Sequence, residues 1–175
     1  MMCILYNVLV VKDAMVLIHL AKITVLATAS GYFDAIVIPP RVYEETVETG
    51  RGHGYPDAEV IAETIENGAI EVAEEPASAL IERAHRYNIQ GGEAEAVALY
   101  WARDADLLAT DDDNVRRKGT ILDLDLIGTP AILLELYDTA RIDASKLARA
   151  IDELRSIGWF STALLDKVEL EAGLA

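Results

Sequence analysis

Short apolar runs alternate along this chain with segments long enough to form helices. The runs cover residues 1–11, 35–38, 69–73, 107–110 and 120–124, and most of their side chains are β-branched or large. Runs that are apolar throughout are typical of strands buried on both faces of a parallel sheet. The alternation therefore predicts a three-layer α/β/α fold with a mostly parallel central sheet of four or five strands.

The segments between these runs carry the start and stop signals of helices. We expect helices over residues 16–29 with a break near Thr24, 42–49, 57–67, 76–87, 93–103, 116–118, 130–140, 145–156 and 161–171. Pro40 suits the first turn of a helix and Gly68 suits the residue after a helix end. Residues 50–56 contain three glycines and one proline, so they are predicted to form a flexible loop.

The length of 175 residues fits one domain with a full hydrophobic core. We expect residues 1–175 to form a single domain, with residues 143–175 as a C-terminal helical extension. Apolar runs are no longer than about nine residues, whereas a membrane-spanning helix needs roughly twenty. No basic residue precedes Lys12, which argues against a signal peptide. Because Cys3 is the only cysteine, an internal disulfide is excluded, and the expected location is cytoplasmic.

The formal net charge of −15 limits what the chain can bind. Proteins that coat nucleic acid are usually basic, because they must neutralise phosphates. Most of the acidic side chains serve solubility. A metal-dependent nuclease tolerates an acidic balance, because its carboxylates hold the cations that meet the phosphate.

Acidic residues follow the expected strands at the edge of the sheet where parallel strands end. Four stretches of the chain offer carboxylates there: Asp13; Glu44 and Glu45; Glu93; and Asp111 with Asp112. The carboxyl edge of an open parallel sheet hosts the active site. Hard cations such as Mg²⁺ and Mn²⁺ prefer oxygen ligands, so the pattern is consistent with a metal site. Acidic loops and Asp helix caps are also common without any metal, so the spacing alone leaves both interpretations open.

The same stretches resemble the PIN-domain proteins. The matching segments are VVKDAMVLIHLAKI at 10–23, IPPRVYEE at 38–45, GGEAEAVAL at 91–99 and ADLLATDD at 105–112, followed by Gly128-Thr129 and residues 157–160. The resemblance runs over nearly the whole chain. Within the family, the segments are similar to an uncharacterised prokaryotic branch of predicted nucleic-acid-binding PIN proteins, related to the toxin ribonucleases of toxin–antitoxin pairs.

What this resemblance implies is a PIN-like fold and a metal-dependent endoribonuclease that acts on RNA with Mg²⁺ or Mn²⁺. It implies four catalytic acids, Asp13, Glu45, Glu93 and Asp112, and metal ligands among Asp13, Glu93, Asp111 and Asp112. Because Asp111 and Asp112 are adjacent, the sequence leaves open which of the two is the ligand. The resemblance also implies a possible antitoxin-like protein partner and a homodimer or higher homo-oligomer. The short apolar runs predict no association with a membrane.

Three further residues are candidates for substrate binding: Thr110, Arg116 and Arg117. Thr110 could supply a hydroxyl near the acids, since Ala14-Met15 stands where many family members have a small polar residue or glycine. Arg116 and Arg117 could bind phosphate, or could form a charged helix face. His19, amid apolar neighbours, is expected to be a buried or helix-face histidine. Trp159 and Phe160 could anchor a dimer or be buried in the core.

Two other functions remain open. The protein could be a catalytically weak or inactive PIN-fold module that works by binding a partner or its own copy, as its acidic surface and Met15 suggest. A response-regulator-like receiver also clusters acids at strand ends. That class needs a lysine after the fifth strand, where this chain has Leu126-Ile127-Gly128-Thr129.

Overall fold

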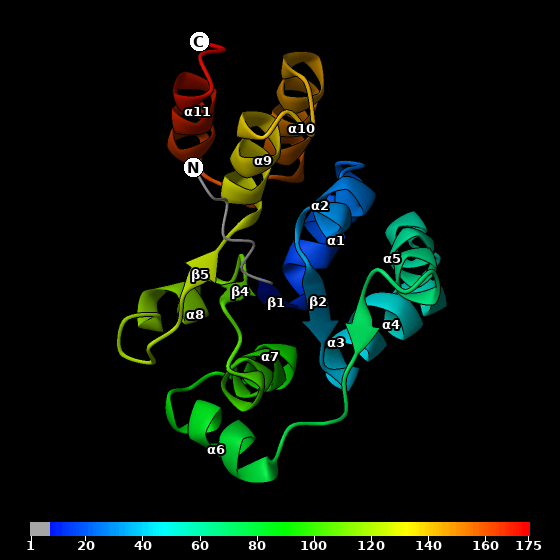
Figure 1. Cartoon of the computed structure of the whole chain (residues 1–175), viewed down its shortest axis with the longest axis vertical. Helices are drawn as coiled ribbons and strands as arrows, with labels where there is room; N and C mark the ends of the chain where they lie inside the picture. Colours follow the sequence, from blue (N-terminus) through cyan, green and yellow to red (C-terminus); the bar gives the residue numbers. More distant parts are fainter. Residues whose placement is uncertain (1–7) are drawn as a thin grey trace, which may run out of the picture.

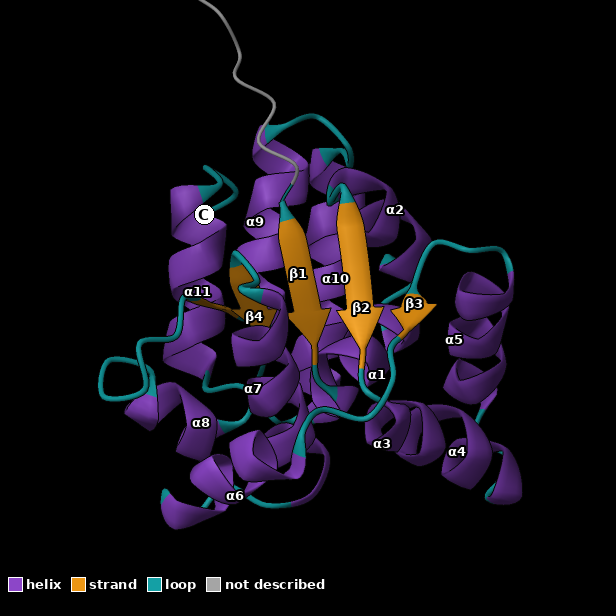
Figure 2. Cartoon of the chain, turned by 60° about the horizontal axis from the view of Figure 1, so that its bottom comes forward, coloured by secondary structure: helices purple, strands orange, loops and turns teal. Residues whose placement is uncertain are grey.

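The computed structural model describes residues 8–175 and contains a five-stranded, all-parallel sheet. The strands are β1 (Leu9–Lys12), β2 (Ala35–Ile38), β3 (Glu71–Val72), β4 (Leu107–Ala109) and β5 (Leu126–Ile127). Figure 2 shows β1 and β2 side by side with their arrowheads pointing the same way. The α/β class and the parallel sheet are confirmed, while residues 1–7 of the expected first strand lie outside the described residues.

The order of strands across the sheet is β3-β2-β1-β4-β5. The chain builds outward from β1 to β3 and then crosses back to place β4 on the other side of β1. This crossing makes the gap after β1 and β4 the topological switch point, where open parallel sheets leave a crevice at their carboxyl ends. The register pairs Lys12 with Ala109, so the segments that follow both strands leave the sheet together.

The fifth strand lies farther along the chain than the sequence indicated. Residues 120–124 form turns, and β5 consists of Leu126–Ile127. Leu122 and Leu124 are buried against α7, which explains their apolar pattern, but Asp123 between them has a left-handed φ of 54° that interrupts an extended strand. The expected strand at residues 120–124 is therefore wrong.

Helices cover both faces of the sheet. They are α1 (Ala14–Lys22), α2 (Leu26–Tyr32), α3 (Pro40–Tyr43), the π-helix η1 (Glu44–Glu48), α4 (Thr49–Gly52), α5 (Pro56–Glu66), α6 (Ser78–Arg86), α7 (Gly91–Arg103), α8 (Asp113–Lys118), α9 (Thr129–Asp138), α10 (Ala144–Ile157) and α11 (Thr162–Glu171). The expected break near Thr24 is present, because Thr24 has a left-handed φ of 58° between α1 and α2.

The predicted flexible loop at residues 50–56 is largely wrong. The helix that begins at Pro40 continues through η1 and α4 to Gly52, and α5 already begins at Pro56. Gly50 serves packing here: a Cβ at this position would lie 2.7 Å from the Cβ of Ala58 on α5. The glycine therefore lets two helices approach closely, a role that composition cannot distinguish from loop flexibility.

The core has two layers because successive strand residues point to opposite faces. Val10 belongs to a cluster beneath α1, α2, α5 and α9, whereas Val11 belongs to a cluster beneath α6, α7 and α8. Figure 1 shows α6 and α7 on one side of the strands and α1, α2 and α9 on the other. This arrangement is the three-layer α/β/α fold expected from the sequence.

The C-terminal helices α10 and α11 share the first of these core layers. Leu147, Ile151 and Leu154 of α10 and Leu165 of α11 are buried in the same cluster as Val10. The turn between the two helices brings Trp159 back to the carboxyl edge of the sheet, where its Nε1 donates to the carbonyl oxygen of Asp111. None of the helices within residues 8–175 is long and apolar enough to cross a membrane.

Candidate active site

Asp13 and the segment 110–112 emerge next to each other from the middle of the sheet. The backbone N–H of Asp13 donates to the carbonyl oxygen of Ala109 over 3.0 Å, which extends the β1–β4 ladder by one residue. The strand register therefore fixes how the first and last of the candidate acids approach each other. Their separation in sequence, almost a hundred residues, is closed by the topological switch point.

Asp13 carries a buried oxygen without a partner. Its Oδ1 accepts from the backbone N–H of Val16 over 2.9 Å and caps α1. Its Oδ2 is buried and has no hydrogen-bond partner within residues 8–175, and the whole residue is only 1% exposed. Buried polar atoms are nearly always paired, so an oxygen left over in this way needs an explanation. A cation is one group that satisfies it.

The electrostatics of Asp13 agree with this geometry. The pKa of the Asp13 carboxyl is raised from 3.8 to about 8, chiefly by burial and to a smaller extent by the carboxylates of Asp111 and Glu93. The neighbouring Thr110 hydroxyl and the Val16 amide act in the opposite direction. A negative charge on Asp13 is therefore costly in the protein alone, and a nearby cation would remove much of that cost.

Glu45 and Glu93 meet at the start of α7. Oε1 of Glu45 accepts from the backbone N–H of Gly92 over 3.2 Å. A Cβ at Gly91 would lie 3.7 Å from Oε2 of Glu93 and 3.8 Å from Oε1 of Glu45, so both carboxylates border the same space. The pKa of the half-buried Glu93 is raised by burial first, and by the carboxylates of Asp112 and Glu45 next.

Glu45 reaches the start of α7 from the π-helix η1. The helix from Pro40 widens to π geometry from Glu44 to Glu48, and single π turns in proteins often occur at functional sites. Glu45 is partly buried within the π turn, whereas its neighbour Glu44 is exposed. The structure thus brings Glu45 to the other acids, with Glu44 on the outside.

Asp111 and Asp112, which the sequence could not separate, have different surroundings. The Asp111 carboxylate is buried and accepts three hydrogen bonds: from the Thr129 N–H at 2.8 Å, the Thr129 hydroxyl at 2.5 Å and the His19 Nδ1 at 2.7 Å. Oδ1 of Asp112 accepts from the Val115 N–H at 2.8 Å and caps α8. Asp112 also borders, together with Glu93, a hollow of about 280 Å³. Asp112 is thus the more open of the two carboxylates.

The acids approach one another without forming a finished cage. Within residues 8–175, no group of three or more His, Cys, Asp or Glu side chains is already arranged to hold a metal ion. Mg²⁺ commonly keeps several waters and takes only one or two protein carboxylates, so such a cage is not needed. Asp13, with its free oxygen, and Glu93 and Asp112, beside the hollow, fit a hydrated divalent ion.

The three candidate substrate-binding residues differ in exposure. Thr110 is only 1% exposed, and its hydroxyl accepts from the Asp112 N–H over 3.1 Å, which places it beneath the acids. Arg116 is exposed at the edge of the sheet, and its Nη1 donates to the Thr110 carbonyl over 3.1 Å. Arg117 is exposed on α8 and borders neither the 280 Å³ hollow nor the larger pocket beside Asp111.

Sequence reasoning missed Lys12. Its side chain is fully buried, its Nζ has no hydrogen-bond partner within residues 8–175, and that Nζ lies 5.3 Å from the ring centre of Phe33. Burial lowers the pKa of Lys12 from 10.5 to about 7. The only signal in the sequence was the place of Lys12 in a strand expected to be buried on both faces. Because alternate strand residues share a face, Lys12 lies on the same buried face as Val10.

His19 is buried, one of the two placements the sequence favoured, but it also has a role that its apolar neighbours did not reveal. It is 4% exposed, lies edge-on to Phe160 with ring centres 5.2 Å apart, and binds Asp111. Trp159 is 47% exposed, while Phe160 is partly buried against the core. These residues support the segment that carries the acids.

A family model described as a PIN domain matches residues 9–172. The chain belongs to the PIN-domain family. No curated protein sequence matches it. The PIN fold is a nuclease fold that typically uses divalent metals and acts on nucleic acid, so family membership agrees with the acids gathered at the carboxyl edge.

Proposed function

We propose that this PIN-domain protein is a metal-dependent endoribonuclease that hydrolyses RNA phosphodiester bonds. One observation carries the proposal: Oδ2 of Asp13 is buried at the topological switch point without a hydrogen-bond partner, and the carboxylates of Asp111 and Glu93 are near enough to raise the pKa of Asp13. In a stable core such an oxygen would have a donor. A site that must accept a cation keeps the oxygen free and tolerates the repulsion among acids.

The proposed ligands of Mg²⁺ or Mn²⁺ are Asp13, Glu93 and Asp112, and Glu45 completes the catalytic set. A divalent ion bound there would lower the pKa of a bound water and neutralise charge on the phosphate. Glu45 is held by the Gly92 N–H, and Asp112 by the Val115 N–H, so the chain fixes both carboxylates before substrate arrives. Asp111, with three donors, serves chiefly to hold the segment in place.

Cleavage of RNA by the purified protein tests this proposal directly. We expect cleavage with Mn²⁺ or Mg²⁺ and none in EDTA. Asp13→Asn should abolish it, because the amide keeps the α1 cap but removes the charge. Glu45→Gln should lower the rate, whereas Glu44→Gln, a change to the exposed neighbour, should leave it unchanged. Equal cleavage by the Asp13→Asn protein would sink the proposal.

The alternative is a catalytically weak PIN-fold protein that acts through a partner or its own copy. The net charge of −15 and the absence of a finished carboxylate cage within the described residues favour it. Titration calorimetry separates the two: no Mn²⁺ binding and no cleavage would leave the interaction module. An antitoxin-like protein, a homo-oligomer and a cytoplasmic location remain proposals that rest on the family resemblance and on the single cysteine.

A further inference from the structure

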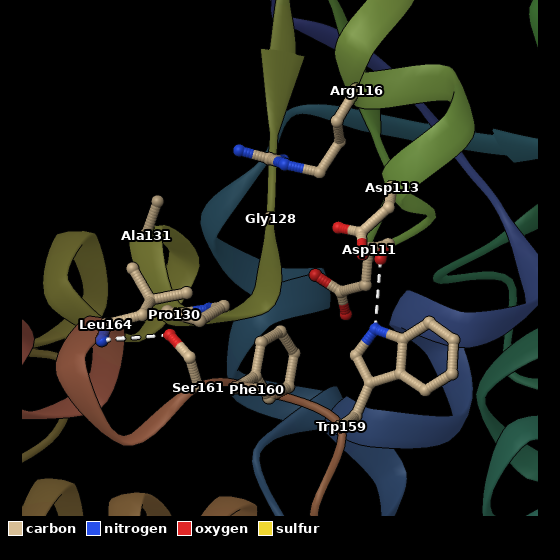
Figure 3. Close-up of a pocket in the computed structure, with 10 residues that line it drawn as sticks. All are labelled: Asp111, Asp113, Arg116, Gly128, Pro130, Ala131, Trp159, Phe160, Ser161 and Leu164. Carbon is tan, nitrogen blue, oxygen red and sulfur yellow. Dashed lines mark hydrogen bonds between the residues drawn. The ribbon is translucent and has the colours of Figure 1, made fainter.

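A second cavity borders the acidic segment 111–113, and none of the proposed metal ligands lines it. It has a volume of about 390 Å³, within the range of roughly 300–1,000 Å³ that small-ligand sites occupy. Its lining includes Asp111, Asp113, Arg116, Trp159, Phe160 and Leu164. Figure 3 shows Arg116 on one side of the cavity, Trp159 and Phe160 on the other, and the two acids between them.

The position of the cavity relates it to the cleavage site. Asp112 borders the 280 Å³ hollow with Glu93, while Asp111 and Asp113, its two neighbours in the chain, border the 390 Å³ cavity. Three consecutive residues thus line the two spaces, which places both spaces beside the same short segment after β4. A strand whose phosphate sits at Asp112 can therefore place a neighbouring base in the cavity.

Trp159 is held with its indole at the cavity wall. Its Nε1 donates to the carbonyl oxygen of Asp111 over 3.0 Å, and the side chain remains 47% exposed. His19 lies beside the ring at a tilted angle of 45° with centres 6.3 Å apart. An indole fixed in this way can stack on a base with little loss of side-chain entropy. Aromatic side chains at such positions are how proteins bind unpaired bases.

Arg116 provides a positive charge at the rim. One nitrogen donates to the Thr110 carbonyl, and the ion pairs of residues 8–175 do not include this guanidinium. Its remaining N–H groups can therefore meet a phosphate. The acids Asp111 and Asp113 inside the cavity would repel a phosphate, so the neutral base is the part of a nucleotide that suits the interior.

We propose that this cavity binds one unpaired base of single-stranded RNA, stacked on Trp159, while Arg116 holds the phosphate next to it. The inference rests on the proposed function and adds to it a subsite that positions the strand. A duplex does not satisfy this subsite, because its bases are stacked on each other. The C-terminal turn between α10 and α11 thus supplies the wall that selects unpaired RNA.

Binding in EDTA tests the subsite without any cleavage. The probe is a dye-labelled oligoadenylate, followed by fluorescence anisotropy, with the same strand in a duplex as comparison. Trp159→Ala should weaken single-strand binding about 5- to 100-fold, the cost of removing one stacked base. Trp159→Phe should retain most of the affinity, because the smaller ring still stacks although it lacks the bond to Asp111. A Phe variant as weak as the Ala variant would overturn the stacking role.

The salt dependence of RNA binding tests the role of Arg116. Arg116→Ala should weaken binding and reduce the slope of log K against log salt by about 0.7, the value for one phosphate contact on a single strand. Arg149→Ala, which removes an equal charge from an exposed position on α10, is the matched control and should leave the slope unchanged. Equal slopes for wild type and Arg116→Ala would contradict the phosphate contact.

Trp159 fluorescence gives an independent readout. In a Trp101→Phe protein, Trp159 is the only tryptophan, and oligoadenylate should quench its emission. A shift of that emission with protein concentration alone, without quenching by RNA, would mean that a second copy covers the cavity and would overturn the proposal. Binding without cleavage in Mn²⁺ would sink only the nuclease function. Cleavage and binding that are both indifferent to Trp159→Ala would sink only the subsite.

Discussion

His19 Nδ1 and Asp111 Oδ2 lie 2.7 Å apart in the buried interior, and this contact ties α1 to the segment that follows β4. The same carboxylate binds the backbone and hydroxyl of Thr129 at the start of α9. Asp111 thus joins three elements that are far apart in sequence. Hydrogen bonds within the protein occupy the Asp111 carboxylate, so its neighbour Asp112 is the more available of the two for a metal ion.

We expect substitution of Asp111 to lower stability and substitution of Asp112 to lower activity. Asp111→Ala leaves buried donors of His19 and Thr129 without an acceptor and should cost about 3 kcal/mol of unfolding free energy, or roughly 6–12 °C in Tm. Asp112→Asn keeps the α8 cap, so it should leave Tm nearly unchanged and lower RNA cleavage. Thermal unfolding followed by circular dichroism measures the first effect. The reverse pattern would reassign the ligand to Asp111.

The raised pKa of Asp13 makes stability depend on pH. Between about pH 4 and pH 8 the folded protein keeps a proton on Asp13 that the unfolded chain releases, so unfolding free energy should fall as pH rises through this window. Urea unfolding in EDTA at several pH values measures the trend. Asp13→Asn removes the titration and should flatten it, and Mn²⁺ should restore stability most strongly near pH 8. An unchanged slope in the variant would show that Asp13 does not titrate there.

Lys12 should act against the fold at low pH. The pKa of Lys12 is about 7 in the folded protein and 10.5 in the unfolded chain. The free-energy cost of burying its charge is therefore complete below pH 7 and fades as pH rises toward 10.5. Lys12→Met should therefore raise the unfolding free energy at pH 6, on the order of 3 kcal/mol, with a smaller gain at pH 9. Lys22→Met, on the exposed part of α1, is the control and should change little. A destabilised Lys12→Met protein would mean that the charge has a partner.

Gly92→Ala should reduce activity more than stability. Alanine normally favours a helix over glycine by about 1 kcal/mol, but a Cβ at Gly92 would overlap the Glu45 carboxylate. We expect RNA cleavage to fall about tenfold, as when a residue that orients a functional side chain is changed, whereas Mn²⁺ affinity should change less because Glu45 is not one of the proposed metal ligands. Calorimetry and cleavage rates measure this. Gly31→Ala on α2, where a Cβ meets nothing within 4 Å, should leave both unchanged.

Elements were predictable where the local pattern of apolar side chains fits only one kind of secondary structure. β1, β2 and β4 form where short runs are apolar on both faces, and Thr24 interrupts the first helix where the pattern breaks. The expected strand at 120–124 failed because Leu122 and Leu124 are buried by a turn beneath α7, and an alternating pattern cannot distinguish a strand from such a turn. The predicted loop at residues 50–56 was wrong for a related reason, since close helix packing and loop flexibility both favour glycine at a position such as Gly50.

The sequence by itself determined the class of the fold and which acids stand at strand and helix ends, because these follow from local periodicity and from the parallel arrangement of strands. Only the tertiary structure decided how each acid is used. Asp111 is held by His19 and Thr129, Asp13 retains a free oxygen, and Trp159 reaches the edge from the C-terminal turn. These contacts join residues up to about a hundred positions apart, and burial and hydrogen-bond partners at that range depend on how the layers pack.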